Sequence, residues 1–113
     1  MSTVIGQRAE AAAADYLSGR GFQVVARNWR TKWCEIDLIA VKDHRAYFIE
    51  VKYRGSAQAG SGLDYITAAK LRQLKFAAEL WIQDQSWSGE YELSAVELTG
   101  EPPRVINFLP GLT

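Results

Sequence analysis

Hydrophobic residues recur along the chain at two different spacings. In residues 4–19 and 64–85 they fall three and four positions apart, as they do along one face of an α-helix. Residues 22–28, 33–54 and 91–99 are instead rich in Val, Ile, Phe and Tyr, and their apolar and polar side chains tend to alternate. These spacings predict two helices and a set of β-strands.

The first predicted helix ends at a pair of glycines and carries one acidic residue near its apolar face. Gly19 and Gly21 follow the last apolar position, as is favoured at a helix C-terminus. Glu10 lies about 20° beyond the edge of the apolar arc on a helical wheel, so we expect it at the rim of the buried face. The alternative is an ordinary solvated glutamate. The apolar positions are Ile5, Ala9, Ala12, Ala13, Tyr16 and Leu17.

The segment Trp33–Arg54 is expected to form two strands joined by a tight turn. Its two apolar runs are separated by a short polar stretch that contains Asp43 and His44. If these two residues form the tip of the turn, Lys42 opposes Arg45, and this pair sets the register of the whole hairpin.

The same register brings charged residues together at the open end of the hairpin. Asp37 then faces Glu50 and Glu35 faces Lys52, with Cβ atoms about 4.5–5.5 Å apart. Two carboxylates at that distance repel each other, and a divalent cation, which takes oxygen ligands, would remove the repulsion. The alternative is a set of salt bridges, Glu35 with Lys52 and Glu50 with Lys52 or Arg54.

Both faces of the hairpin carry apolar side chains. On one face Ile36, Leu38 and Ala40 oppose Val51, Ile49 and Tyr47, and on the other Ile39 and Val41 oppose Phe48 and Ala46. Apolar residues on both faces predict a sheet that is covered on both sides. The charged residues therefore lie at the end of a largely buried pair of strands, where charges are costly unless they are paired or metal-bound.

The remaining segments complete one expected domain, residues 1–113. We expect a strand at 22–28, a basic aromatic connection at 29–32, a loop at 55–62, a turn at 86–89, a half-buried strand at 91–99 and a short edge strand at 104–108. Thr67 is a candidate N-cap of the second helix. Phe76 and Leu80 point away from the buried side of that helix, toward either a later strand or a partner. Its expected buried stripe is Leu71, Leu74, Ala78, Trp81 and Ile82.

Composition and charge narrow the class of protein. The chain is 48% hydrophobic and 23% charged with zero net charge, which fits a folded soluble protein and argues against a strong nonspecific nucleic-acid binder. Residues 20–54 hold eight basic and four acidic residues, whereas residues 79–103 hold six acidic residues and no Lys or Arg. A basic region around carboxylates suits an anionic substrate, although scattered solvated charge explains the pattern equally simply.

The expected location is the cytoplasm. The single cysteine, Cys34, cannot form an internal disulfide, which fits a reducing compartment. The N-terminal residues lack the basic and apolar segments of a signal peptide, and no apolar run reaches the ~18 residues of a membrane span. We therefore expect no membrane association.

The charged residues of the hairpin suit metal-assisted cleavage of phosphodiester bonds. Asp37 and Glu50 can hold one or two Mg²⁺ ions together with the backbone carbonyl of Val51, and the metal would polarise the phosphate and lower the pKa of a bound water. Lys52 lies on the same face of its strand as Glu50 and can stabilise the negative charge that develops on the phosphate. The spacing Glu50-Val51-Lys52 is common by chance and is weak evidence for this chemistry by itself. The opposed Asp37 strengthens that evidence.

Four segments in a fixed order resemble a known family. GQRAEAAAADYLSGRGFQVVARNWR, CEIDLIAV, YFIEVKYR and ITAAKLRQLKFAAELWI are similar to the YraN-type family of small, endonuclease-like bacterial proteins, over roughly residues 6–98. That family resembles the PD-(D/E)xK nucleases and archaeal Holliday-junction resolvases. The resemblance implies an α/β fold with a restriction-endonuclease-like core, in which helices flank a mixed central β-sheet on both faces.

The resemblance also implies roles for individual residues. It places Asp37, Glu50 and Lys52 at the catalytic positions and makes Glu10 the candidate accessory acid of a Mg²⁺ or Mn²⁺ site. Glu35 and Lys70 match family positions without an assigned role. Two positions differ from the family pattern, because Cys34 and Ala9 stand where glycine is usual.

Three functions remain open at this point. The first is a Mg²⁺-dependent DNA endonuclease, with branched or damaged DNA as its candidate substrate. The second is a non-catalytic nucleic-acid-binding module that keeps the nuclease fold. The third is an interaction protein that forms a homodimer through Phe76 and Leu80, in which the charged residues serve only as salt bridges.

Overall fold

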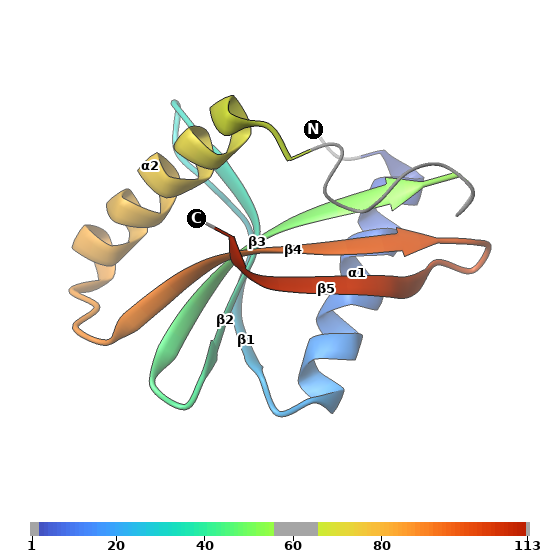
Figure 1. Cartoon of the computed structure of the whole chain (residues 1–113), viewed down its shortest axis with the longest axis horizontal. Coiled ribbons are helices and arrows are strands. Elements are labelled where there is room, and N and C mark those ends of the chain that lie inside the picture. The colour runs from blue at the N-terminus through green and yellow to red at the C-terminus, as the bar shows by residue number, and fades with distance from the viewer. Residues whose placement is uncertain (1–2, 56–65, 113) are drawn as a thin grey trace.

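The computed structural model describes residues 3–55 and 66–112, which form two helices and five strands (Figure 1). The predicted loop at 55–62 lies outside these ranges except for Gly55, as does the predicted start of the second helix at residues 64 and 65. The elements are α1 (Val4–Gly19), β1 (Gln23–Arg30), β2 (Glu35–Lys42), β3 (Arg45–Arg54), α2 (Ala68–Gln85), β4 (Glu90–Thr99) and β5 (Arg104–Leu112).

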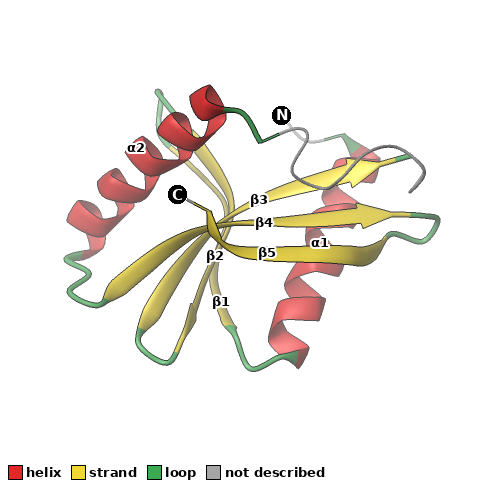
Figure 2. Ribbon diagram, in the orientation of Figure 1, coloured by secondary structure: helices red, strands yellow, loops and turns green. Residues whose placement is uncertain are grey.

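The strands form a mixed sheet in the order β1-β2-β3-β4-β5. Strands β3 and β4 are parallel and all other neighbours are antiparallel, so α2 provides the crossover that a parallel connection requires. Figure 2 shows α1 and α2 on opposite sides of this sheet. The predicted α/β fold, with a mixed central sheet flanked by helices on both faces, is confirmed and is consistent with a restriction-endonuclease-like core.

Two hydrophobic clusters hold the helices to the sheet. Under α1, Leu17 packs with Leu38 and Ile49, and under α2, Trp81 packs with Ile39 and Phe48. The side chains of β2 and β3 therefore alternate between the two clusters, which confirms the prediction that both faces of the hairpin are covered. The rings of Phe48 and Trp81 meet edge to face with their centroids 5.5 Å apart.

The predicted turn of the hairpin is confirmed, and so is its register as far as Leu38 and Ile49; the predicted pairs of Asp37 with Glu50 and of Glu35 with Lys52 lie beyond the observed strand pairing. Asp43 and His44 both have positive φ, 51° and 61°, as the two-residue turns of type I′ require. The strand pairs run from Lys42 opposite Arg45 to the last pair, which joins Leu38 to Ile49.

The last two strands differ from the prediction in burial and length. Strand β4 was expected to be half-buried, but it is buried on both faces from Leu93 to Thr99 because it lies between β3 and β5 under both layers. Strand β5 continues past the expected end at residue 108 to Leu112, and its Pro110 is tolerated because β5 is an edge strand. Strand β1 also extends two residues into the predicted connection, to Arg30.

Helix α2 presents the predicted stripe to the sheet. Leu74, Ala77, Ala78 and Trp81 are buried, and Leu71 and Ile82 pack partly buried against the same cluster. The two residues predicted to point away from the sheet differ in exposure, since Phe76 is 48% exposed whereas Leu80 is half-buried. Neither helix in the described ranges combines the length and the hydropathy that a membrane span needs.

Removing the N-cap of α2 should destabilise the fold moderately. The Thr67 hydroxyl accepts a hydrogen bond from the Lys70 amide at 3.1 Å, as the sequence predicted. Thr67→Ala should lower the free energy of unfolding by about 1 kcal/mol, whereas Thr67→Ser should keep most of it. Urea unfolding followed by circular dichroism measures both variants, and equal losses would show that the hydroxyl does not act as a cap.

Candidate metal and active site

The candidate site begins where the pairing of β2 and β3 ends. Asp37 lies one position beyond the last pair, and its Oδ2 atom accepts a hydrogen bond from the backbone N–H of Val51 at 2.8 Å. The aspartate side chain therefore satisfies a backbone donor of β3. It is held against the same short segment that carries Glu50 and Lys52.

The alternation of side chains breaks in β1 and β2 next to this aspartate. Asn28 has a left-handed backbone with φ 51°, and the pair that follows it joins Trp29 to Ile36. Ile36 was predicted to share a face with Leu38, but it packs in the cluster under α2 whereas Leu38 packs under α1. The prediction for Ile36 is wrong because the alternation of side chains along β2 is interrupted between Ile36 and Leu38, at the level of the left-handed Asn28 on the neighbouring strand β1.

The same irregularity connects the sheet to Glu10 on α1. The Asn28 side-chain amide donates a hydrogen bond to Oε1 of Glu10 at 3.0 Å, and Glu10 is only 7% exposed. Glu10 is thus more buried than the predicted rim position, and the alternative of a solvated helix residue is wrong. Sequence reasoning did not single out Asn28, and the only local signal was the tolerance of asparagine for positive φ.

Asp37 experiences a strongly unfavourable environment for its negative charge. Burial is the largest cause of the raised pKa, and the charge of Glu50 increases it further. The hydrogen bond from the Val51 amide acts in the opposite direction. The resulting pKa is about 7 instead of 3.8. Smaller contributions that also raise the pKa come from Glu10 and Glu35. The carboxylates of α1, β2 and β3 are therefore close enough to affect one another.

Two basic residues contact the glutamates of the site. Lys70, in the first turn of α2, lies 3.3 Å from Glu50, and Arg30 lies 3.2 Å from Glu35. The salt-bridge alternative named Lys52 or Arg54 as the partners of these glutamates. Glu50 and Glu35 pair with a residue of α2 and a residue of β1, two partners that the hairpin pattern alone could not have shown.

A hollow of about 310 Å³ opens beside Glu50. The residues before β2 form one side, where Cys34 Sγ lies 3.4 Å from Thr31 Oγ1, and α2 forms the other. Cys34 therefore lines the hollow, at the position where the resemblance to the family led us to expect glycine. The lining residues are Trp33, Cys34, Glu35, Glu50, Lys70, Gln73, Leu74 and Phe76.

The donors fit a hard cation by their chemistry and their mutual repulsion. Carboxylate oxygens are the ligands that Mg²⁺ prefers, and a cation would remove the charge repulsion that raises the pKa of Asp37. In residues 3–55 and 66–112, no three His, Cys, Asp or Glu side chains are already gathered as a cage. Binding of a cation by both glutamates would therefore require Glu50 to leave its salt bridge with Lys70 and Glu10 to leave its hydrogen bond with Asn28.

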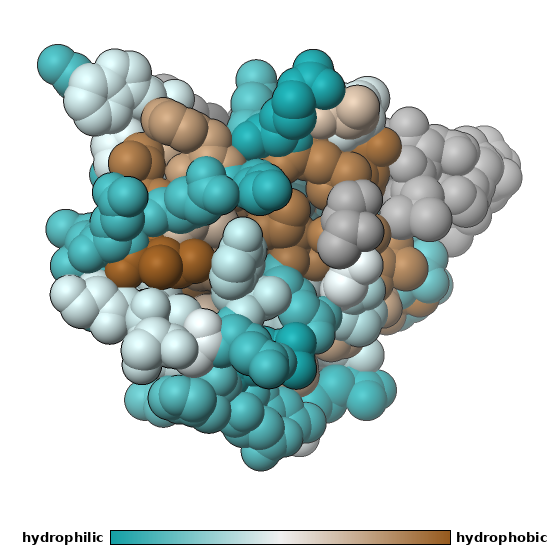
Figure 3. All heavy atoms as spheres, turned by 60° about the vertical axis from the view of Figure 1, so that its left-hand side comes forward, coloured by the Kyte–Doolittle hydropathy of each residue, from teal (hydrophilic) through white to brown (hydrophobic). Residues whose placement is uncertain are grey.

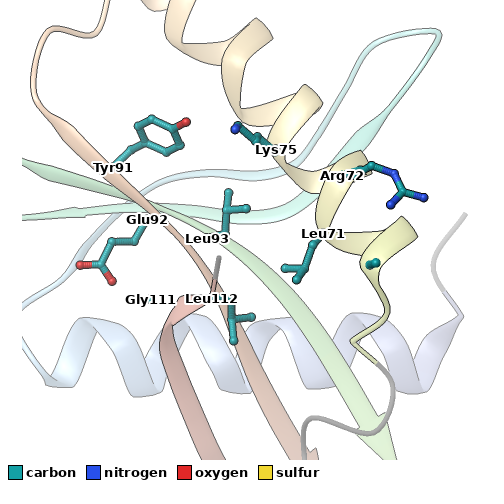
Figure 4. A pocket seen from close by; sticks show the side chains of 9 residues that line it. Leu71, Arg72, Lys75, Tyr91, Glu92, Leu93, Gly111 and Leu112 are labelled. Atoms are coloured by element: carbon teal, nitrogen blue, oxygen red, sulfur yellow. The ribbon is translucent and has the colours of Figure 1, made fainter.

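A larger groove, of about 600 Å³, lies between α2 and the strands β4 and β5. Leu71, Leu93 and Leu112 gather at its centre (Figure 4). Figure 3 shows apolar atoms exposed beside hydrophilic ones on the side of the molecule that carries α2. Neither Asp37, Glu50 nor Glu10 lines this groove, so we place the candidate site at the carboxylates instead.

The basic and acidic segments of the sequence meet in space. Arg45 on β3 contacts Glu90 and Glu92 on β4, and Arg54 lies 3.3 Å from Glu97 farther along the same pair of strands. Part of the basic charge of residues 20–54 is therefore neutralised by the acidic strand. The separation of charge along the chain does not carry over fully to the surface.

Comparisons with known proteins show the family to which this chain belongs. The fold and the site define a small mixed α/β protein whose carboxylates lie where the pairing of strands β2 and β3 ends. The family model described as "Uncharacterised protein family UPF0102" matches residues 9–98, and the chain belongs to this family.

The relatives are bacterial and carry the same family name. A UPF0102 protein of Pseudomonas putida (strain KT2440) is 43% identical over 89 residues, which cover 79% of this chain and 72% of the relative. One of Renibacterium salmoninarum is 39% identical over 112 residues, which cover 96% and 94% of the two chains. One of Mycolicibacterium vanbaalenii is 41% identical over 81 residues, which cover 72% and 67%.

Proposed function

We propose that this protein is a Mg²⁺-dependent DNA endonuclease that acts on branched or damaged DNA. The observation that carries the proposal is the environment of Asp37, whose pKa is raised by burial and by the charge of Glu50. A fold gains no stability from two carboxylates placed so that they repel each other, but a metal site requires such an arrangement. Perturbed carboxylates of this kind are typical of functional sites.

Each residue of the site has a role in this proposal. Asp37, Glu50, the Val51 carbonyl and Glu10 would hold Mg²⁺ or Mn²⁺, which supplies polarisation of the phosphate and a water of lowered pKa. The Asp37–Val51 hydrogen bond fixes the position of the aspartate relative to the Val51 carbonyl. Lys52 is exposed on β3 and would stabilise negative charge on the phosphate during cleavage.

We expect cleavage of DNA that depends on both the metal and Asp37. Branched, flapped and single-stranded DNAs incubated with Mg²⁺ or Mn²⁺ should be cut by the wild-type protein and at least about 100-fold more slowly by Asp37→Ala and Glu50→Gln, because each variant removes a metal ligand. Gel analysis of labelled strands measures the rates. Asp43→Asn, which removes an exposed carboxylate at the tip of the hairpin, is the matched control and should cut normally.

Two results would contradict the proposal. Equal trace cleavage by wild type and Asp37→Ala would identify a contaminating nuclease. DNA binding without a Mn²⁺ site that is lost in Asp37→Ala, measured by calorimetric titration, would favour the non-catalytic binding module instead.

A further inference from the structure

The hollow beside Glu50 is flanked by two exposed aromatic side chains. Trp33 is 70% exposed and Phe76 is 48% exposed, and they come from the segment before β2 and from α2. Single exposed apolar residues are common on protein surfaces. Here, however, two aromatic residues line the same hollow as Glu50, which is a candidate metal ligand. This arrangement suggests a ligand with a flat, apolar face near the carboxylates.

Two lysines lie beside these aromatic residues, together with the carboxylates of Glu35 and Glu50 that also line the hollow. The Lys32 ammonium lies 4.9 Å from the centre of the Trp33 ring, and Lys70 approaches Glu50 from the helix side. Sites for single-stranded nucleic acid combine these two features, because aromatic rings stack on bases while basic side chains follow the phosphates. The hollow therefore has the chemistry of a nucleotide site, with the ring systems for a base and the cations for its backbone.

The size of the hollow and the physics of stacking specify an unpaired base. A volume of about 310 Å³ lies at the lower end of the range for small-ligand sites, roughly 300–1,000 Å³. Within a duplex, neighbouring base pairs cover both faces of each base, so a base must leave the stack before an aromatic side chain can take their place.

We infer that Trp33 and Phe76 hold an unpaired base of the DNA beside Glu50, which makes the substrate a DNA with unpaired nucleotides next to the cleaved bond. This inference rests on the proposed function and adds a substrate class to it. The aromatic residues position the base, and the carboxylates of α1, β2 and β3 remain the groups that act on the phosphate.

Binding to DNA with and without the unpaired bases tests this inference. The probes are a fluorescein-labelled duplex with a short single-stranded extension and the same duplex with abasic nucleotides in that extension, both measured by anisotropy in EDTA so that no cleavage occurs. Wild type should bind the base-bearing DNA about 5- to 150-fold more tightly, since each stacked base contributes about 1–3 kcal/mol. Trp33→Leu should lose this preference, whereas Trp33→Phe should keep much of it.

Matched controls separate the inference from the proposed function. Val4→Ala changes another exposed apolar residue, on α1, and should keep the wild-type preference. Equal binding of both DNAs by wild type would overturn the inference, and Asp37-dependent cleavage would still support the endonuclease. Failure of wild type to bind any DNA, together with absent cleavage, would overturn both.

A second copy of the chain is the other partner that could cover Phe76. Sedimentation of wild type and Phe76→Glu distinguishes the two cases. A wild-type dimer that Phe76→Glu converts to a monomer, without any preference for base-bearing DNA, would show that the aromatic residues form a contact between copies and would overturn the inference.

Discussion

Raising the pH from 5 to 8 should destabilise the folded protein, and Asp37→Asn should remove much of that loss. The Asp37 carboxyl ionises near pH 7 in the folded protein and near 3.8 when it is unperturbed, as in the unfolded chain. Between these values the folded state holds a proton that the unfolded state has released, so the free energy of unfolding falls by up to about 1.4 kcal/mol per pH unit. The stability from this group is thus fully present below pH 4 and is lost by about pH 7.

Asparagine at position 37 keeps the contact that matters for folding. Its side-chain oxygen can still accept the bond from the Val51 amide, while it carries no charge to be buried beside Glu50. At pH 8 we therefore expect Asp37→Asn to be more stable than wild type by a few kcal/mol, with a smaller difference at pH 5 and little difference below pH 4.

Urea unfolding at several pH values measures this difference directly. Asp43→Asn is the control, because its carboxylate is exposed at the hairpin turn and should leave the pH dependence unchanged. If Asp37→Asn and wild type lose stability in parallel from pH 5 to 8, Asp37 does not carry the unfavourable charge. Under the proposed function, the stabilised variant should also fail to cleave DNA, because a side chain that lowers stability is often retained for activity.

The second large effect is expected at the buried Glu97 on β4. Glu97 is 3% exposed, lies 3.3 Å from Arg54, and accepts a hydrogen bond from the Asn107 amide at 2.9 Å. Glu97→Ala should cost about 3–5 kcal/mol, because it leaves the largely buried guanidinium of Arg54 without this carboxylate. Glu97→Gln should cost less, since it preserves the volume and the oxygen that Asn107 contacts.

An exposed ion pair provides the matched control for Glu97. Glu101, after β4, pairs with Arg8 on α1, and both side chains are largely exposed. Glu101→Ala should therefore change the thermal midpoint far less than Glu97→Ala. Similar midpoints for these two variants, measured by calorimetry, would show that burial does not strengthen the Arg54–Glu97 pair.

The predictable parts of this fold are those that depend on neighbours in sequence. The hairpin register followed from the two-residue turn at Asp43 and His44, and the cap of α2 followed from Thr67 alone. Each feature is decided within a few residues, where spacing and turn chemistry act directly.

The parts that sequence reasoning missed depend on contacts between distant segments. The burial of Glu10 needs Asn28 in a left-handed conformation, and the pairing of Glu50 with Lys70 needs the position of α2 on the sheet. Likewise, β4 has the alternation of a half-buried strand, but its place between β3 and β5 decides its burial. Hydrophobic periodicity carries no information about such partners.

The parallel pairing of β3 and β4 has a consequence for how the chain reaches this structure. Asp37 and Glu50 belong to a hairpin whose strands meet across a two-residue turn, so their approach costs little chain entropy. Strand β4 can join β3 only after the long connection through α2 has closed, and non-local closure of this kind slows folding. Asp37 and Glu50 are thus encoded in a local part of the sheet that can form early, whereas strand β4 and helix α2 join it with the slower, long-range contacts.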